Sequence, residues 1–333
     1  MFNKLFIDVQ CTVCLYVDDL KITCVDPDII SNVVDKLEEL FPGLKPNSST
    51  SHSYLGMNFD YEKPGEFRIT MKGYIDDVLS QCPEIVSSVC TPALSNLFEL
   101  VDSPLLDDAR RERFHSLVAK LLYLAKRVRP DILTAISFLA TRVQAPTEND
   151  WKRLIRVLRY LYGSRDLGIV LRPGDGPYRV IGSADAAFGV HQDGKSHSGL
   201  VIALGEGPVF VRSAKQKIVT KSSTEAELVS LSDGCSQVIW SRDFVLGQGY
   251  GIGPATIYQD NMSTIAMVEN GRPTSDRTRH INVRYFFVSD RVSSGEVNIV
   301  HLPSQEMSSD FLSKPKVGQE FLYLRAKLLN WYY

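Results

Sequence analysis

Residues 178–189 read YRVIGSADAAFG, an apolar run that leads into the acidic Asp185. Three other acids of the C-terminal half lie at comparable boundaries: Glu227 opens a helical pattern, Asp260 follows a β-rich run, and Asp310 lies in a short segment after an apolar run. Hard divalent cations such as Mg²⁺ prefer oxygen ligands, and two ions about 3.5–4 Å apart can activate a water and stabilise a leaving oxygen at phosphorus. Four carboxylates that converge from separate elements would supply such a site.

The residues around each acid are more informative than the spacing, because the chain has 39 acidic residues to choose from. The informative segments are S183ADAAFG189, S196HSGLVIALG205, S213AKQK217, S222STEAEL228, D260NMSTIA266, R277TRHINVRYFFV288 and D310FLSKP315. In order and approximate spacing they resemble the RNase H domain of copia-type LTR retrotransposon polyproteins. The resemblance implies an RNase H-like domain over 176–315, with a five-stranded mixed sheet and flanking helices. The family's four catalytic acids then fall on Asp185, Glu227, Asp260 and Asp310.

The choice between Glu225 and Glu227 stays open on helical geometry alone. Residues two apart on a helix cannot both face one site. A helical wheel places the two acids on opposite flanks of the apolar stripe, so the wheel does not decide between them. The resemblance favours Glu227.

The resemblance also implies chemistry and partners. It implies an RNase H-type endoribonuclease that cleaves RNA in RNA–DNA hybrids, with two Mg²⁺ (or Mn²⁺) ions at the four acids. The expected partners are an RNA–DNA hybrid or another nucleic acid duplex, together with other parts of the same polyprotein, such as integrase and the N-terminal reverse transcriptase. No apolar run reaches the roughly 18 residues of a membrane span, and six cysteines do not suggest a disulfide scaffold. We therefore expect an intracellular chain, in the cytoplasm (within a virus-like particle) or the nucleus, that is not secreted.

A second motif lies near the N-terminus, where residues 16–20 read YVDDL. The flanking apolar segments predict a hairpin with Asp18 and Asp19 at its turn. Two like charges side by side at a turn are unfavourable unless a metal ion offsets their repulsion. The motif resembles the palm hairpin of copia-type reverse transcriptases, and Asp18 and Asp19 match the family's two adjacent metal-binding aspartates.

One feature of that family has no counterpart here. The family uses a third aspartate on a strand well upstream of the hairpin, and only 17 residues precede Asp18. We therefore expect the chain to begin within the polymerase palm and the polymerase part to be inactive alone. Two alternatives to an RNase H-type nuclease remain: a non-catalytic nucleic-acid-binding remnant of a decayed or domesticated element, and a fragment of a full RNA-directed DNA polymerase polyprotein.

Positive charge is concentrated in one region, although the whole chain has a formal charge of −2. Residues 110–166 hold thirteen basic and five acidic residues, a surplus of eight, and such local patches bind phosphates. The amphipathic helix predicted over 147–163 carries a basic stripe, for which a solvated face and a phosphate-binding face fit equally well. On a helix starting at residue 277, Arg277, His280 and Arg284 would share one face, for which there are two interpretations: a phosphate track beside the site, or a polar face packed against the sheet. The candidate nucleic-acid-binding residues are Lys152, Arg153, Arg156, Arg159, Arg277 and Arg284.

The predicted fold class is therefore an α/β and α+β multidomain chain. A partial reverse-transcriptase palm is expected over 1–90 and a helical thumb- or connection-like region over 91–175. The RNase H-like domain over 176–315 and a C-terminal helical tail over 316–333 complete the chain.

Overall fold

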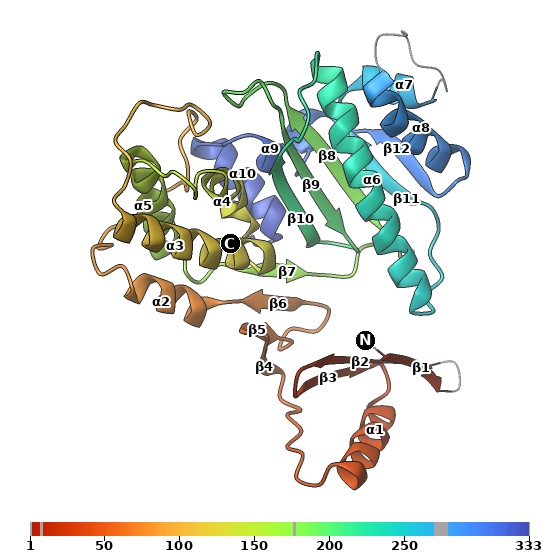
Figure 1. Cartoon of the computed structure of the whole chain (residues 1–333). Coiled ribbons are helices and arrows are strands. Elements are labelled where there is room, and N and C mark those ends of the chain that lie inside the picture. The colour runs from red at the N-terminus through yellow and green to blue at the C-terminus, as the bar shows by residue number, and fades with distance from the viewer. Residues whose placement is uncertain (1, 7–8, 176–177, 270–278, 333) are drawn as a thin grey trace.

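The computed structural model describes residues 2–6, 9–175, 178–269 and 279–332. The described residues form a mixed α/β structure with three sheets (Figure 1). Across the described residues, no helix combines the length and the apolar character that crossing a membrane requires.

The largest sheet lies in the C-terminal half and has five strands in the order β10-β9-β8-β11-β12. Neighbours β10, β9 and β8 run antiparallel, whereas β8, β11 and β12 run parallel. The strands are β8 (Ile181–Ala187), β9 (His197–Ala203), β10 (Pro208–Lys215), β11 (Ala255–Gln259) and β12 (Val297–His301). A five-stranded mixed sheet is what the sequence predicted for this region.

Both faces of this sheet are covered, because alternate side chains of a strand point to opposite sides. On β9, Leu200 and Ile202 join a core formed with α6 (Ser223–Gly247) and α8 (Arg279–Ser293). The helix α7 (Met262–Glu269) packs against both of these helices. Val201 between them joins a second core on the opposite face. That face is covered by α4 (Leu133–Ala140) and α9 (Asp310–Ser313), and α10 (Gly318–Leu329) packs on α9 and joins the same core.

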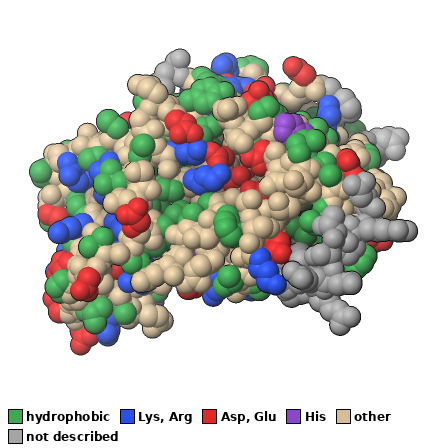
Figure 2. Space-filling view, turned by 90° about the horizontal axis from the view of Figure 1, so that it is seen from above, with side chains coloured by type: hydrophobic (Ala, Val, Ile, Leu, Met, Phe, Trp, Pro, Cys, Tyr) green, Lys and Arg blue, Asp and Glu red, His purple; other side chains and the backbone are tan. Residues whose placement is uncertain are grey.

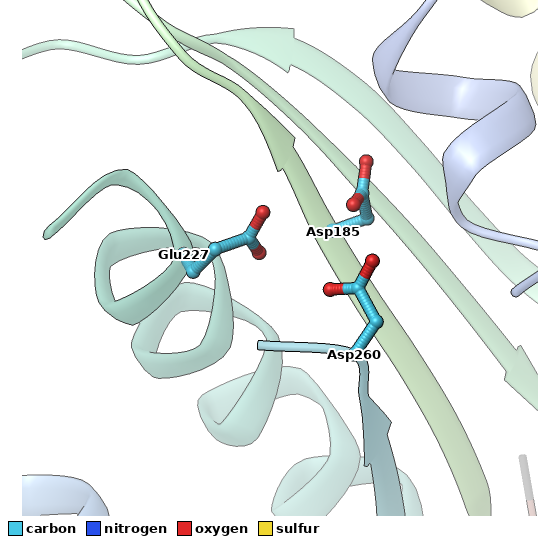
Figure 3. A group of neighbouring side chains, drawn as sticks. All are labelled: Asp185, Glu227 and Asp260. Carbon is cyan, nitrogen blue, oxygen red and sulfur yellow. The ribbon is translucent and has the colours of Figure 1, made fainter. Parts of the chain in front are cut away.

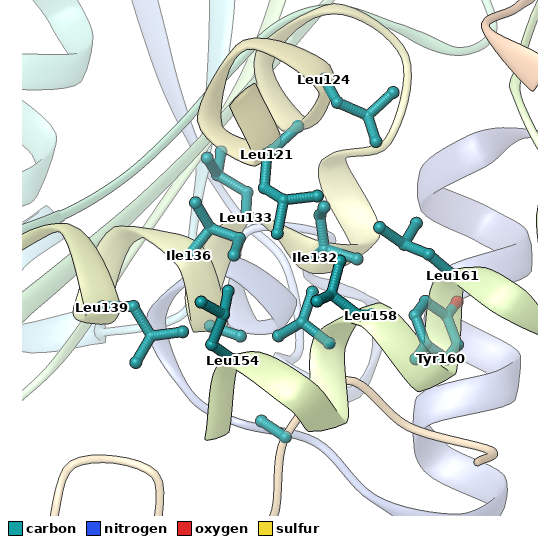
Figure 4. Packing of buried hydrophobic residues seen from close by; sticks show 14 of the residues in the cluster. Leu121, Leu124, Ile132, Leu133, Ile136, Leu139, Leu154, Leu158, Tyr160 and Leu161 are labelled. Atoms are coloured by element: carbon teal, nitrogen blue, oxygen red, sulfur yellow. The ribbon is translucent and has the colours of Figure 1, made fainter. Parts of the chain in front are cut away.

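The second core extends into the helical region, and Figure 4 shows its centre. Its helices are α3 (Asp108–Arg127), the short η1 (Pro130–Ile132), α4 and α5 (Glu148–Tyr162), and α5 coincides with the amphipathic helix predicted over 147–163. Two buried hydroxyls tie α4 to the C-terminal half: Thr134 Oγ1 donates to the Phe311 carbonyl at 2.9 Å, and Ser137 Oγ donates to the Ser213 carbonyl at 2.6 Å. Packing is therefore continuous between the helical region and the five-stranded sheet.

The N-terminal part is built differently and lies below the other elements in Figure 1. A three-stranded antiparallel sheet contains β1 (Phe2–Phe6), β2 (Val9–Tyr16) and β3 (Asp19–Cys24), followed by α1 (Pro27–Leu40), none of whose residues is buried. A four-stranded sheet of β4 (Ser51–Tyr54), β5 (Met57–Asp60), β6 (Phe67–Thr70) and β7 (Ile169–Leu171), with α2 (Lys72–Ser80), connects it to the helices.

The predicted hairpin turn at Asp18 and Asp19 needs a correction. Asp19 pairs with Tyr16 as the first residue of β3, so Val17 and Asp18 form the turn. Val17 has φ 54°, a left-handed conformation that is costly for a β-branched residue. A two-residue turn of this kind allows β2 and β3 to pair closely.

Candidate metal centre

Three of the four predicted acids come together at one end of the five-stranded sheet (Figure 3). Asp185 lies on β8, Glu227 on the second turn of α6, and Asp260 directly after β11. One carboxylate oxygen of each lies within 4.8 Å of the others. Within the described ranges, no other group of three His, Cys, Asp or Glu residues converges in this way.

The sheet topology explains this convergence. Because β8 and β11 are parallel neighbours, residues near their carboxyl ends lie at the same edge of the sheet. The first turns of α6 lie on β8 and so bring a helical acid to the same place. Seen from above, Figure 2 shows acidic side chains gathered near the middle of this face, beside lysine and arginine side chains.

Two N–H donors orient the Glu227 carboxylate. The backbone N–H of Ala186 donates to Oε1 at 3.1 Å, and the side-chain amide of Gln259 donates to Oε2 at 3.3 Å. Gln259 is completely buried and also donates to the Ala184 carbonyl at 3.4 Å, so its amide is fixed by β8. Glu227 is therefore held toward Asp185 by both strands of the site.

Glu225 does not face the site and instead makes hydrogen bonds at the start of α6. Its Oε2 accepts from the Lys221 backbone N–H at 2.7 Å, and its own N–H donates to the Ser222 hydroxyl at 3.2 Å. These are capping interactions, which satisfy N–H groups that a helix start leaves free. The geometry thus separates the two acids that the helical wheel left undecided.

Asp185 is the most buried acid of the group, with 1% of its surface exposed. Its Oδ2 accepts from the Ser313 hydroxyl and from Lys314 Nζ at 3.4 Å, whereas no described residue donates to its buried Oδ1. Burial raises the pKa of Asp185. Burial, followed by the charges of Asp185 and Asp260, raises the pKa of Glu227 to about 9. A divalent cation would supply the missing partner and relieve this repulsion, so the residues present fit an Mg²⁺ or Mn²⁺ ion.

The fourth predicted acid, Asp310, lies beside this group but is not part of it. Lys314 Nζ contacts Asp310 Oδ1 at 2.7 Å and thereby links it to Asp185, while Lys316 contacts Asp310 Oδ2. Three of the four predicted carboxylates thus form the cluster, and two lysines neutralise the fourth beside it.

Few features of the sequence indicate which residues bring this fourth acid close to the other three. Gly199, opposite Asp185 on β9, has no Cβ, and a Cβ there would lie 2.3 Å from the Ser309 carbonyl oxygen. The absence of a side chain lets α9 lie directly on the sheet. The one available signal was spacing, since Lys314 is four residues after Asp310 and such pairs meet on a helix.

Asp18 and Asp19 form no comparable site. Both are exposed at the β2–β3 turn. Where the structure describes the chain, no third ligand joins them.

The predicted basic residues are mostly engaged within the chain. From α5, Arg153 donates to the Glu99 carbonyl, Arg156 to Thr91 Oγ1 at 3.0 Å, and Arg159 to the Ser87 carbonyl at 3.4 Å. These contacts hold the segment 87–99 against α5, a use that the stripe alone did not predict.

The remaining members of that predicted set differ from one another. Lys152 is exposed, and Arg284 on α8 pairs with Asp233 on α6. Arg277 lies outside the described residues.

Comparison with known proteins identifies the relatives of this chain, although no family model matches it. It is 33% identical over 318 residues to the "Retrovirus-related Pol polyprotein from transposon RE1" of Arabidopsis thaliana, a match that covers 94% of this chain and 21% of that protein. The RE2 polyprotein of the same plant is 32% identical over 305 residues, which is 90% of this chain and 20% of that protein. The chain thus spans about a fifth of the length of these relatives.

Among solved structures, the foamy viral protease–reverse transcriptase in complex with RNA/DNA hybrid is similar with a TM-score of 0.54. The match covers 92% of this chain and 37% of that one at 11% identity, so it shows likeness of fold alone. From its sequence matches, the chain belongs to the Pol polyproteins of copia-type retrotransposons, of which it corresponds to a segment.

Proposed function

We propose that this segment is a metal-dependent endonuclease that cleaves the RNA strand of RNA–DNA hybrids at Asp185, Glu227 and Asp260. One observation carries the proposal. Three carboxylates from separate elements converge, and the most buried one keeps an oxygen without a donor among the described residues. A structural ion-pair network would leave no such oxygen, because a buried polar atom without a partner costs free energy.

The three carboxylates would hold the cation, with Asp310 as a further ligand nearby. When bound, a divalent cation activates a water and stabilises the leaving oxygen at phosphorus. The chain's own residues position the ligands: Gln259 and the Ala186 N–H orient Glu227, and Ser304 Oγ donates to Asp260 Oδ2 at 2.6 Å. Asp260 is more exposed than its two partners, so substrate would approach from its side.

Two observations support an RNA–DNA hybrid as the substrate. The chain belongs to a retrotransposon polyprotein family, and the fold resembles a reverse transcriptase that was solved with an RNA/DNA hybrid. We propose the hybrid as the nucleic acid partner and other segments of the polyprotein as protein partners.

The test is cleavage of end-labelled RNA by the full 333-residue chain in Mg²⁺, with the RNA single-stranded, in an RNA duplex or paired with DNA. We expect cleavage in the hybrid alone, its loss in EDTA, and its loss in Asp260→Asn. Asp243→Asn, at an exposed acid of the same half, is the matched control and should remain active. Cleavage that persists in EDTA or in Asp260→Asn would contradict the proposal.

For Asp18 and Asp19 we propose a lesser role. Both are exposed on a hairpin, so they are available as two ligands of a polymerase-type site that needs a further carboxylate. Primer extension on an RNA template by this chain alone should therefore yield no product. Extension that Asp18→Asn abolishes would show that another residue completes the site.

A further inference from the structure

We propose that Lys314 holds the place of a second cation in the acidic site, between Asp185 and Asp310. A divalent ion would then bind the Asp185–Glu227–Asp260 group first and would reach Asp310 only by displacing the lysine ammonium. This inference rests on the proposed function and adds an order of loading to it.

The position of Lys314 is the first observation. Its Nζ lies 2.7 Å from Asp310 Oδ1 and 3.4 Å from Asp185 Oδ2, so one ammonium bridges two carboxylates that belong to different elements. Its backbone N–H donates to the Asp310 carbonyl at 3.2 Å and ends α9. Lys314 is the C-cap of the short α9, so this hydrogen bond to the first residue of the helix keeps its backbone close to Asp310.

The distribution of partners among the carboxylates is the second observation. Asp310 Oδ2 contacts Lys316, which also pairs with Glu320 at 2.7 Å, so each oxygen of Asp310 has its own lysine. Asp185 Oδ1, by contrast, has no partner in the described part of the chain. Asp185 Oδ1 is therefore available to a cation, whereas the positive charges of two lysines already occupy the side of the site at Asp310.

The exposure of the two lysine side chains indicates which of them a cation could displace from Asp310. The side chain of Lys314 is 41% exposed and that of Lys316 is 13% exposed, whereas that of Asp185 is 1% exposed. Lys314 thus reaches the site from the solvent side on a flexible four-carbon chain. It can rotate away without disturbing the core, whereas Lys316 remains as the fixed partner of Asp310.

The test is Mn²⁺ binding to the full chain without nucleic acid, followed by electron paramagnetic resonance of the free ion. For the wild type we expect one ion bound tightly and a second bound weakly. Lys314→Met should strengthen the second site about tenfold or more, the scale on which residues next to the ligands change metal affinity. Lys72→Met is the matched control, because Lys72 also pairs four residues along a helix, with Asp76 at 3.3 Å, and is 48% exposed. The control should match the wild type.

A second measurement is needed because Lys314→Met removes the positive charge beside Asp185 and Asp310 and can therefore destabilise the fold. Lys314→Gln keeps a hydrogen-bond donor without the charge. Both variants should gain more thermal stability from Mn²⁺ than the wild type gains, and a variant that folds only with Mn²⁺ would support the inference equally. Two Mn²⁺ affinities that equal those of the wild type in both variants would overturn it. A wild type that binds no Mn²⁺ would instead contradict the proposed function.

Discussion

The chain carries two acidic motifs in very different settings. Asp18 and Asp19 are adjacent in sequence, lie on one hairpin and are exposed. Asp185, Glu227 and Asp260 are 33 or more residues apart from one another in sequence, yet their carboxylates converge within 4.8 Å of one another. Water screens the first pair, so its repulsion costs little. The second group is largely withdrawn from water, where repulsion and lost hydration are expensive unless a cation is present. The free-energy cost of burying three carboxylates together therefore makes the second group the better candidate for a cation site.

The largest expected effect is on hybrid cleavage, and it should differ between two acids of the same helix, Glu227 and Glu225. Glu227→Gln should reduce hybrid cleavage by more than about 100-fold, because losing a ligand should exceed the 10–100-fold effect of residues next to the ligands. Glu225→Gln should keep cleavage and change the free energy of unfolding by less than about 1 kcal/mol, as expected for a cap. Single-turnover cleavage and urea unfolding of both variants provide the measurement. The opposite ranking in the cleavage assay would reverse the assignment of these acids.

The second largest expected effect is on the stability that a metal ion adds, which should depend on the buried acids and not on the hairpin acids. Mn²⁺ at 100 times its dissociation constant should add about 2.7 kcal/mol to the free energy of unfolding. Asp185→Asn should remove this gain, whereas Asp19→Asn should leave it in place. Thermal unfolding with and without Mn²⁺ measures both, and an equal loss in the two variants would erase the distinction.

A pH profile of stability in EDTA should give a somewhat smaller effect. The pKa of Glu227 rises from 4.5 to about 9 on folding, so the folded state keeps a proton that the unfolded chain releases. Stability is therefore full below about pH 4.5 and falls as pH rises toward 9. We expect a loss of about 2 kcal/mol or more between pH 5 and pH 9, and Glu227→Gln should flatten the profile. Stability that rises over this range in the wild type, by an amount that Glu227→Gln removes, would contradict the burial of this carboxyl.

The smallest effects concern the basic residues of α5. Arg159→Ala removes a hydrogen bond to the Ser87 carbonyl, so it should cost up to about 1 kcal/mol of stability. Lys152→Ala should leave stability unchanged, because this side chain is exposed. If the exposed lysine contacts a phosphate, Lys152→Ala should also reduce the salt dependence of hybrid binding by about one ion. Hybrid titrations across salt concentrations and urea unfolding separate the two roles. An equal loss of salt dependence in both variants would restore the whole stripe as a phosphate-binding surface.

The sequence predicted the parts of the molecule that depend on periodicity and on local motifs. The helix α5 follows from apolar spacing, and the segments around Asp185, Glu227 and Asp260 led to the acids that converge. It could not predict that Lys314 and Lys316 neutralise Asp310, because this depends on how α9 lies against β9 at Gly199.

The linker that joins the N-terminal part to the helices shows the same limit. Segment 87–99 forms no helix or strand, and no motif in it indicated that Arg153, Arg156 and Arg159 would bind its carbonyl and hydroxyl groups. Side-chain orientation is likewise what separated Glu225 from Glu227. Patterns place elements, whereas contacts between distant segments decide what each charged side chain does.

A crystal structure of the chain in Mn²⁺, with anomalous scattering recorded at the manganese edge, would show directly which of the two acidic motifs binds a metal ion. We expect an anomalous peak among the carboxylates of Asp185, Glu227 and Asp260, and none at the turn that carries Asp18 and Asp19. A peak at the hairpin turn, with none among the three buried carboxylates, would contradict it.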